Sequence, residues 1–346
     1  MNSTTEGNLA PELAAQRPAT EPPEARGLRR DEVRLLVARR DRLTHTTFDR
    51  IGDHLEAGDL LVVNTSATLP AAIDARRGDN DIVVHFSARL DDDRWAIELR
   101  APDRSGPLLD GRRGEVITLD GGAVIEVLST TGIEGRSRIV EAGVDVAGGI
   151  EDHLARHGRP ISYSYVTETW PLSMYQTVFA REPGSAEMPS AARPFTAELV
   201  TTLISRGVVF APVLLHAGVS SLEGGEVPLP ERFRVPAPTA RLVNQTRAAG
   251  GRVIAVGTTV TRALESAGDR DGVVRAADGW TDLVLGGERG AFVVDGLVTG
   301  WHPAQATHQA LLRAVAGPEM VTAAYDAATK DRYLWHEFGD SCLLLP

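Results

Sequence analysis

Cysteine is almost missing from this sequence, since Cys342 is the only one in 346 residues. One thiol excludes an internal disulfide, a zinc site built on paired thiolates and a Cys-x-x-Cys redox centre. Long apolar runs are missing as well: no stretch approaches the roughly 18 uninterrupted apolar residues of a membrane span, and no apolar signal segment is visible. We therefore expect a cytoplasmic protein of a reducing compartment, with no membrane partner.

Lysine is just as rare, because Lys330 is the only one and arginine supplies nearly all the positive charge. The formal net charge is -11. A net negative charge does not attract a polyanion, so any contact with nucleic acid has to come from a local arginine patch. The commoner interpretation of arginines scattered among acids is a solvated surface. We expect a monomer or a weak homo-oligomer.

A metal centre is not indicated either. The nine histidines show no shared metal-ligand spacing, and the sequence contains no His-Glu-x-x-His. We therefore expect no metal cofactor.

The length predicts two packed units. Residues 1–28 are rich in Pro, Glu, Ala and Thr without periodicity, which predicts a flexible N-terminal arm. Residues 72–149 contain short alternating runs separated by tight turns, which predicts an inserted antiparallel β-barrel domain. In residues 29–71 and 150–346 strands alternate with helices, as in a parallel-rich sheet covered by helices. The predicted fold class is α/β, with the barrel inserted into the α/β domain.

Four apolar runs in the α/β part end in polar or glycine-rich loops. Ligands of parallel sheets lie beyond the carboxyl ends of the strands. If the four strands share one sheet, their loops form one cleft. The loops are Asn64-Thr65-Ser66, the segment from His216 to Ser221, Gly257-Thr258-Thr259, and Gly300-Trp301-His302-Pro303.

The loop that begins at Gly257 has the clearest pattern. Glycine permits a tight turn, and Thr258 and Thr259 can cap the following helix while offering N–H groups and hydroxyls to a carboxylate or a ribose. Arg262 and Glu265 lie one turn apart on that helix, so the arginine could bind a ligand carboxylate and the glutamate could accept from ribose hydroxyls. An ordinary cap followed by a surface ion pair explains the pattern equally well.

His216 ends another of the four runs, where a histidine can act as a general acid or base near neutral pH. Ser220 and Ser221 follow it, but without a Gly-x-Ser-x-Gly turn they do not predict a nucleophile. His302 is a second candidate, although a loop residue before a helix is its commoner role. Tyr175 belongs to an aromatic segment that could stack a purine, though hydrophobic packing is more common.

Several sequence segments, spread in a fixed order over nearly the whole chain, are similar to those of a known protein family. They are PELAAQRP (11–18), GDLLVVNT (58–65), YQTVFA (175–180), IAVGTT (254–259) followed by Arg262, and LVTGWHP (297–303). In this order and spacing they resemble the S-adenosylmethionine:tRNA ribosyltransferase-isomerases of queuosine biosynthesis.

The resemblance implies a fold, a reaction and a set of substrates. The fold is an α/β domain with an inserted β-barrel. The reaction transfers and isomerises the ribosyl part of S-adenosylmethionine, the co-substrate, onto 7-aminomethyl-7-deazaguanine in tRNA; adenine and methionine leave, and epoxyqueuosine forms. Because the sulfonium acidifies the adjacent ribose carbon, the chemistry needs a base and exclusion of water more than a metal.

The sequence departs from the family pattern in two loops. Residues 188–196 read Met-Pro-Ser-Ala-Ala-Arg-Pro-Phe-Thr, so Pro194 replaces a family histidine, and we take the preceding Arg193 together with His216 as the catalytic candidates. In the second loop Ser220 and Ser221 stand where the family has Gly-Thr. Two alternatives therefore stay open: an S-adenosylmethionine-dependent enzyme with another acceptor, and a binding protein without turnover.

Overall fold

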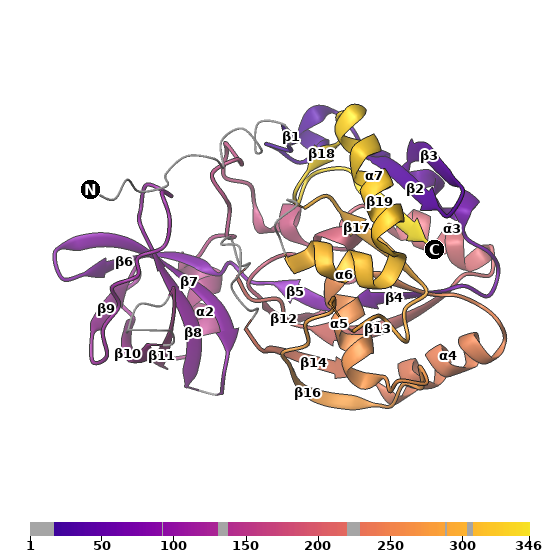
Figure 1. Cartoon of the computed structure of the whole chain (residues 1–346). Coiled ribbons are helices and arrows are strands. Elements are labelled where there is room, and N and C mark those ends of the chain that lie inside the picture. Colours follow the sequence, from indigo (N-terminus) through magenta and orange to yellow (C-terminus); the bar gives the residue numbers. More distant parts are fainter. Residues whose placement is uncertain (1–16, 92, 131–137, 220–228, 288, 303–306) are drawn as a thin grey trace, which may run out of the picture.

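The computed structural model describes residues 17–91, 93–130, 138–219, 229–287, 289–302 and 307–346. A nine-stranded mixed sheet with helices on both faces forms the larger part, and a closed six-stranded barrel lies beside it (Figure 1). The predicted fold class, a parallel-rich α/β sheet with an antiparallel β-barrel, is confirmed. None of the helices in the described ranges is long and apolar enough to cross a membrane.

Four parallel strands form the middle of the sheet. They are β13 (Val209–Leu215), β4 (Leu60–Asn64), β15 (Val253–Val256) and β17 (Gly296–Gly300), side by side in this order. β4 and β15 are buried along their whole length, as their unbroken apolar sequences predict for strands covered on both faces.

The outer strands complete the sheet. β14 (Glu231–Val235) and β16 (Ala277–Thr281) pair antiparallel beyond β13. Beyond β17 follow β19 (Ser341–Leu345), β2 (Arg34–Arg39) and β3 (Arg42–Thr47), with β19 antiparallel to β17 and parallel to β2. Two small parallel pairs lie outside it, β1 (Arg17–Pro18) with β18 (Leu334–Trp335), and β5 (Ser66–Thr68) with β12 (Glu182–Ser185).

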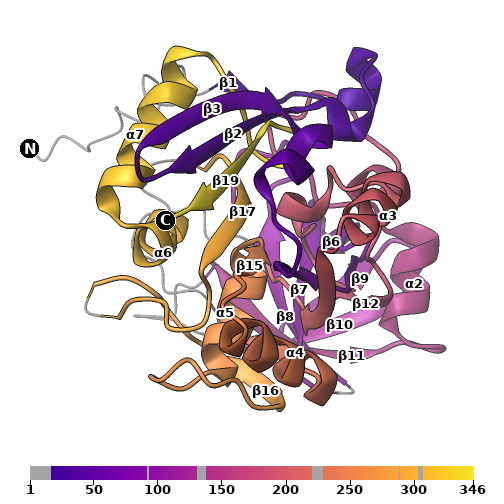
Figure 2. The ribbon, with the colours of Figure 1, turned by 90° about the vertical axis from the view of Figure 1, so that its right-hand side faces the viewer.

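Alternate side chains of the strands enter two hydrophobic cores, one on each face. Leu60 and Val62 face α4 (Ala237–Ala248), α5 (Thr258–Ala267), α6 (Thr307–Ala316) and α7 (Pro318–Lys330), visible in Figure 2. Leu61 and Val63 face α3 (Ala197–Ser205) and the 3-10 helices η3 (Phe48–His54) and η6 (Ser190–Ala192).

The barrel is formed by six consecutive strands and is closed, which removes exposed strand edges. They are β6 (Ala72–Arg77), β7 (Asn80–Arg89), β8 (Arg94–Arg100), β9 (Val116–Leu119), β10 (Val124–Thr130) and β11 (Ile139–Asp145). Ile150 and Leu154 of α2 (Ile150–His157) belong to the barrel's hydrophobic core. This helix packs with the barrel, although its sequence position placed it with the α/β part.

The second half of the predicted flexible arm is folded, and the structure corrects that prediction for residues 17–28. Ala19 is buried, and its N–H donates to the carbonyl of Trp335 at 3.0 Å. The 3-10 helix η1 (Pro23–Arg26) brings Arg26 to the carbonyl of Phe338, also at 3.0 Å. The local composition, rich in Pro and Glu, does not reveal these contacts, because Ala19 and Arg26 bond to residues that lie more than 300 positions away in the sequence. Residues 1–16 lie outside the described ranges.

A buried ionic cluster forms on the outer face of the barrel strands. Glu98 on β8 stands opposite His85 on β7, and Arg100 shares its face because strand residues two apart point the same way. The Glu98 carboxylate accepts from Arg100 Nη1 at 2.9 Å and from Arg138 Nη1 at 2.8 Å. Burial raises the pKa of Glu98, but the hydrogen bond from His85 and the two guanidinium charges outweigh it and hold the pKa at about 2.

Replacing this carboxylate should destabilise the barrel. We expect Glu98→Gln to lower the free energy of unfolding by about 3–5 kcal/mol, because two buried guanidinium groups lose their counter-charge. Since its pKa is depressed in the folded state, the stabilisation is present above about pH 4.5 and is lost as the pH falls toward 2. Urea unfolding at pH 7 and pH 3 measures both effects. Glu126→Gln on the exposed face of β10 is the matched control and should change stability by less than about 0.5 kcal/mol.

Candidate active site

The four polar loops leave the sheet at the same edge, the one formed by the carboxyl ends of its four parallel strands. Because β13, β4, β15 and β17 are parallel neighbours, the residues that follow them lie side by side: His216, Thr65, Gly257 and Trp301. The arrangement that the sequence predicted for these loops is therefore present in the topology. Ser220 and Ser221 lie outside the described residues.

Asn64 connects three of these elements. Its Nδ2 donates to the carbonyl of Leu215 at 2.7 Å, and its Oδ1 accepts from the N–H groups of Leu215 and Ser66 at 3.0 Å each. Nδ2 also lies 3.4 Å from Oγ1 of Thr259. The side chain is fully buried, so these bonds fix the ends of β4 and β13 and the start of α5 relative to one another.

The His216 side chain contacts Ser66, which in turn contacts Ser185, and neither serine was among the predicted site residues. Its Nδ1 lies 2.8 Å from Oγ of Ser66, which lies 2.6 Å from Oγ of Ser185. Gly184 packs against the imidazole, and a Cβ there would meet the ring at 2.5 Å, so glycine is required. Burial lowers the pKa of His216; the Glu182 carboxylate opposes this shift and Arg234 and Arg232 reinforce it, so the ring is mostly neutral near pH 7. Only the pairing of β5 with β12 reveals these contacts.

No side chain caps the start of α5. Gly257 has φ of 98°, and its N–H donates to the carbonyl of Val298 at 2.9 Å. The helix begins at Thr258, and its N-cap makes no side-chain hydrogen bond. The N–H groups of a first helical turn have no intrahelical acceptor, and they favour a carboxylate or another polar oxygen. The backbone here can therefore serve the role predicted from the Gly257-Thr258-Thr259 sequence.

Arg262 and Glu265 both bind groups of the protein itself. The Arg262 guanidinium pairs with the Glu231 carboxylate and donates to the carbonyls of Leu283 at 3.0 Å and Thr281 at 3.2 Å. They do not form the surface ion pair with each other that was the alternative interpretation. A ligand carboxylate would have to replace Glu231 at Arg262.

Glu265 is buried within the protein rather than at its surface. Its carboxylate accepts from the backbone N–H groups of Phe292, Val293 and Val294 at 2.9–3.1 Å. These bonds fix the 292–294 segment, so the side chain has a structural use independent of any ribose.

The remaining predicted residues differ in their surroundings. Thr65 donates from Oγ1 to the carbonyl of Val213 at 3.1 Å. Tyr175, in η5 (Leu172–Tyr175), packs against Phe338 with ring centroids 5.1 Å apart. His302 stacks on His308 at 4.4 Å, and burial lowers the pKa of His302 well below its usual range.

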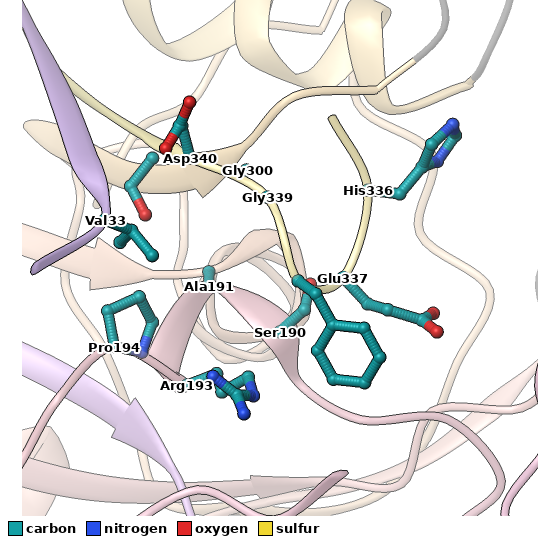
Figure 3. Close-up of a pocket in the computed structure, with 12 residues that line it drawn as sticks. Val33, Ser190, Ala191, Arg193, Pro194, Gly300, His336, Glu337, Gly339 and Asp340 are labelled. Atoms are coloured by element: carbon teal, nitrogen blue, oxygen red, sulfur yellow. The ribbon is translucent and has the colours of Figure 1, made fainter. Parts of the chain in front are cut away.

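Arg193 is buried near the carboxyl end of β17. Its Nη2 donates to Glu24 at 2.8 Å and its Nε to the carbonyl of Met174 at 2.9 Å. It lines a pocket together with Ser190 and Ala191 of η6, Gly300 at the end of β17, and the turn from His336 to Ser341 (Figure 3). Ala191 also lies next to Gly257. One residue of the pocket, Ala191, thus lies beside the residue that precedes α5.

Comparison with known proteins agrees with the fold and the resemblance. The profile of the family described as "Queuosine biosynthesis protein" matches residues 6–344. The chain belongs to this family. A relative from Pelotomaculum thermopropionicum, named S-adenosylmethionine:tRNA ribosyltransferase-isomerase, is 35% identical over 97% of both chains, and one of the same name from Symbiobacterium thermophilum is 35% identical over 98% of both.

A solved relative is similar to this chain over nearly its whole length. The crystal structure of S-adenosylmethionine tRNA ribosyltransferase from Thermotoga maritima is 30% identical, with a TM-score of 0.50, and the match covers 98% of this chain and 99% of that one. The family resemblance expected from the ordered segments is therefore confirmed. Within the described ranges, no group of His, Cys, Asp and Glu side chains is arranged to hold a metal ion.

The hydrogen bonds of Asn64 yield a stability prediction for this family member. Asn64→Ala should lower the free energy of unfolding by about 2–4 kcal/mol, because it removes the side-chain partner of the buried N–H and C=O of Leu215 and of the N–H of Ser66. Chemical denaturation measures the loss. The neighbouring Thr65→Val removes a single hydrogen bond of a partly exposed side chain and should cost about 1 kcal/mol or less. Equal losses in the two variants would contradict the role of Asn64.

Proposed function

We propose that the enzyme transfers and isomerises the ribosyl moiety of S-adenosylmethionine onto 7-aminomethyl-7-deazaguanine in tRNA, giving epoxyqueuosine. The observation that carries this proposal is the match over nearly the full length of the chain to relatives named for that activity. The edge formed by the loops after β4, β13, β15 and β17 supports it, because three of the segments that resemble the family, 58–65, 254–259 and 297–303, meet there.

S-Adenosylmethionine is proposed to lie along this edge. The first turn of α5, with Gly257, Thr258 and Thr259, offers N–H groups and hydroxyls to its carboxylate or ribose oxygens. Asn64, at the end of the neighbouring strand, sets the position of that turn, and Thr65 beside it adds a polar, partly exposed side chain. Because Asn64 is fully buried, its own hydrogen bonds are shielded from water.

His216 is proposed to stabilise the departing adenine. If Nδ1 accepts the Ser66 hydroxyl proton, the neutral ring carries its own proton on Nε2 and can donate it in a hydrogen bond. Arg232 and Arg234 act on the same ring, and each is paired with an acid on a side chain that stays about 40% exposed. They are proposed as the local arginine patch for tRNA. A requirement for a metal is not part of the proposal.

Adenine release tests the activity. The enzyme is incubated with S-adenosylmethionine and with tRNA that carries 7-aminomethyl-7-deazaguanine at the wobble position, and adenine is quantified by chromatography. We expect adenine only when this tRNA is present. Adenine without tRNA would favour a different acceptor, and binding of S-adenosylmethionine without adenine release would favour a binding protein without turnover.

The ion pair between Arg262 and Glu231 gives a second test. Arg262→Ala should weaken S-adenosylmethionine binding by about 1.5–3 kcal/mol, the scale of a hydrogen bond to a charged group. Glu231→Gln should preserve or tighten binding, because it frees the guanidinium for the ligand carboxylate. Calorimetry measures both dissociation constants. An unchanged dissociation constant in Arg262→Ala would remove this arginine from the binding site.

A further inference from the structure

One tryptophan lies on the surface of the α/β part, and none of the sequence patterns pointed to it. Trp280 is 43% exposed, whereas the other four tryptophans are buried or partly buried. Within the described ranges, no aromatic ring or guanidinium group stacks on its indole. A single exposed apolar side chain needs no explanation by itself. The side chains beside Trp280 are what distinguish it.

Strand pairing places His216, Arg232 and Trp280 in one row. Arg232 on β14 is directly opposite Trp280 on β16. On the other side of β14, the His216 N–H donates to the carbonyl of Arg232 at 3.0 Å, which extends the register of β13 with β14 by one residue. Paired residues of neighbouring strands point to the same face of a sheet. The three side chains therefore share one face, with Trp280 two strand spacings, roughly 10 Å, from His216.

This face points away from α5. Phe233 of β14 enters the core that α5 covers, and the hydroxyl of Thr281 lies 2.6 Å from that of Ser266 on α5. Because strand residues alternate between faces, Arg232 and Trp280 point to the opposite side. Figure 1 shows β14 and β16 at the lower margin of the α/β part, where they are the last strands of the sheet. The row thus runs from the end of β13 to an accessible edge.

Two arginines lie in this row and next to it. Arg234, two residues along β14, points to the same face as Arg232. Arg232 pairs through Nη2 with Asp278, and Arg234 pairs through Nη2 with Glu182 at 2.5 Å. An ion pair between exposed side chains contributes little to stability, so either guanidinium can exchange its carboxylate for a phosphate. Both arginines lower the pKa of His216, as expected for charges close to its ring.

An exposed aromatic ring beside guanidinium groups fits single-stranded RNA. Aromatic side chains stack on unpaired bases, and arginines bind the phosphates that connect those bases. A base modified at the wobble position belongs to an unpaired loop, so its neighbours in that loop are free to stack on a protein ring. His216 is the proposed contact of the departing adenine. A loop that presents its acceptor base there has Arg232 and Trp280 within reach of the adjoining nucleotide.

We propose that Trp280 stacks on an unpaired base next to the acceptor nucleotide of the tRNA, and that Arg232 binds the phosphate between these two nucleotides. Trp280 is then a binding residue that fixes the register of the loop, so that 7-aminomethyl-7-deazaguanine, and not a neighbouring base, meets the ribosyl group. This inference rests on the proposed function, because it names the surface that receives the tRNA. S-Adenosylmethionine binding does not depend on Trp280.

Binding of an RNA hairpin tests the proposal. The hairpin carries 7-aminomethyl-7-deazaguanine in an anticodon loop, and fluorescence anisotropy gives its dissociation constant for the unmodified enzyme, W280A, W280F and I204A. W280A should weaken binding by about 5–150-fold, the loss of one stacked base, and W280F should recover most of it, because a phenyl ring still stacks. I204A removes an exposed apolar side chain of α3, before the amino end of β13, and should bind as the unmodified enzyme does.

Hairpins that lack one base identify the stacked partner. Two further hairpins are abasic on the 5′ side or on the 3′ side of the modified nucleotide. One of them should bind the unmodified enzyme more weakly, and this loss should disappear in W280A, because the same stack cannot be lost twice. An affinity of W280A within about twofold of the unmodified enzyme, or an abasic loss that persists in full in W280A, would overturn the proposal.

Salt dependence separates the arginine from the tryptophan. R232Q should reduce the slope of log Kd against log salt concentration by about 1, because one phosphate contact is lost. W280A should keep the slope, because stacking on a neutral ring releases no counterions. An unchanged slope in R232Q contradicts the phosphate contact. The urea midpoint and the dissociation constant of S-adenosylmethionine should be the same in W280A, W280F and the unmodified enzyme; a loss of either in W280A assigns Trp280 a structural role instead.

The same measurements distinguish this inference from the proposed function. If the hairpin does not bind the unmodified enzyme, tRNA is not the acceptor, and both are wrong. If it binds W280A as tightly as the unmodified enzyme, the proposed function stands and Trp280 is removed from the RNA surface. Sedimentation tests another occupant of the edge strand β16, a second copy of the chain. A dimer that W280A converts to a monomer assigns Trp280 to that interface and contradicts the stacking role.

Discussion

The hydrogen bonds of Asn64 are the contact on which the arrangement of the site depends. They join the end of β4 to the end of β13 and reach the first turn of α5, so three loops share one buried amide. Parallel strands alone bring loops to the same edge, but they leave each loop free to adopt its own path. A buried amide with both of its ends engaged removes that freedom, because any other path leaves polar groups without partners.

The sequence predicted the scaffold well because its signals are local. Unbroken apolar strands such as Leu60–Asn64, alternating with helices, indicate a parallel sheet, and closely spaced alternating runs such as Asn80–Arg89 indicate the barrel. The errors lie where distant contacts decide. Ala19 and Arg26 look unstructured until their partners near residue 335 are known, and α2 joins the barrel core although it follows the barrel in sequence.

Prediction of the site was limited for the same reason. An apolar run that leads to Asn64 or His216 can be recognised locally, whereas the chain of hydrogen bonds from Ser185 through Ser66 to His216 forms only through the pairing of β5 with β12. Arg262 and Glu265 have the residue types that a ligand would require, yet a carboxylate and backbone groups from other segments already bind them. Trp280 has no motif at all. Its place opposite Arg232 is a property of strand pairing, which a linear pattern does not show.

The charge state of the site suggests how a cationic substrate changes it. Burial lowers the pKa of His216, His302 and His336 and raises that of Glu337, so near pH 7 these groups are mostly uncharged although the chain as a whole is acidic. Arg193, which lines the pocket, is paired with Glu24, so these neutral groups lie close to a fixed ion pair. A cation that binds near a carboxyl group favours its ionised form, since opposite charges attract strongly at low dielectric.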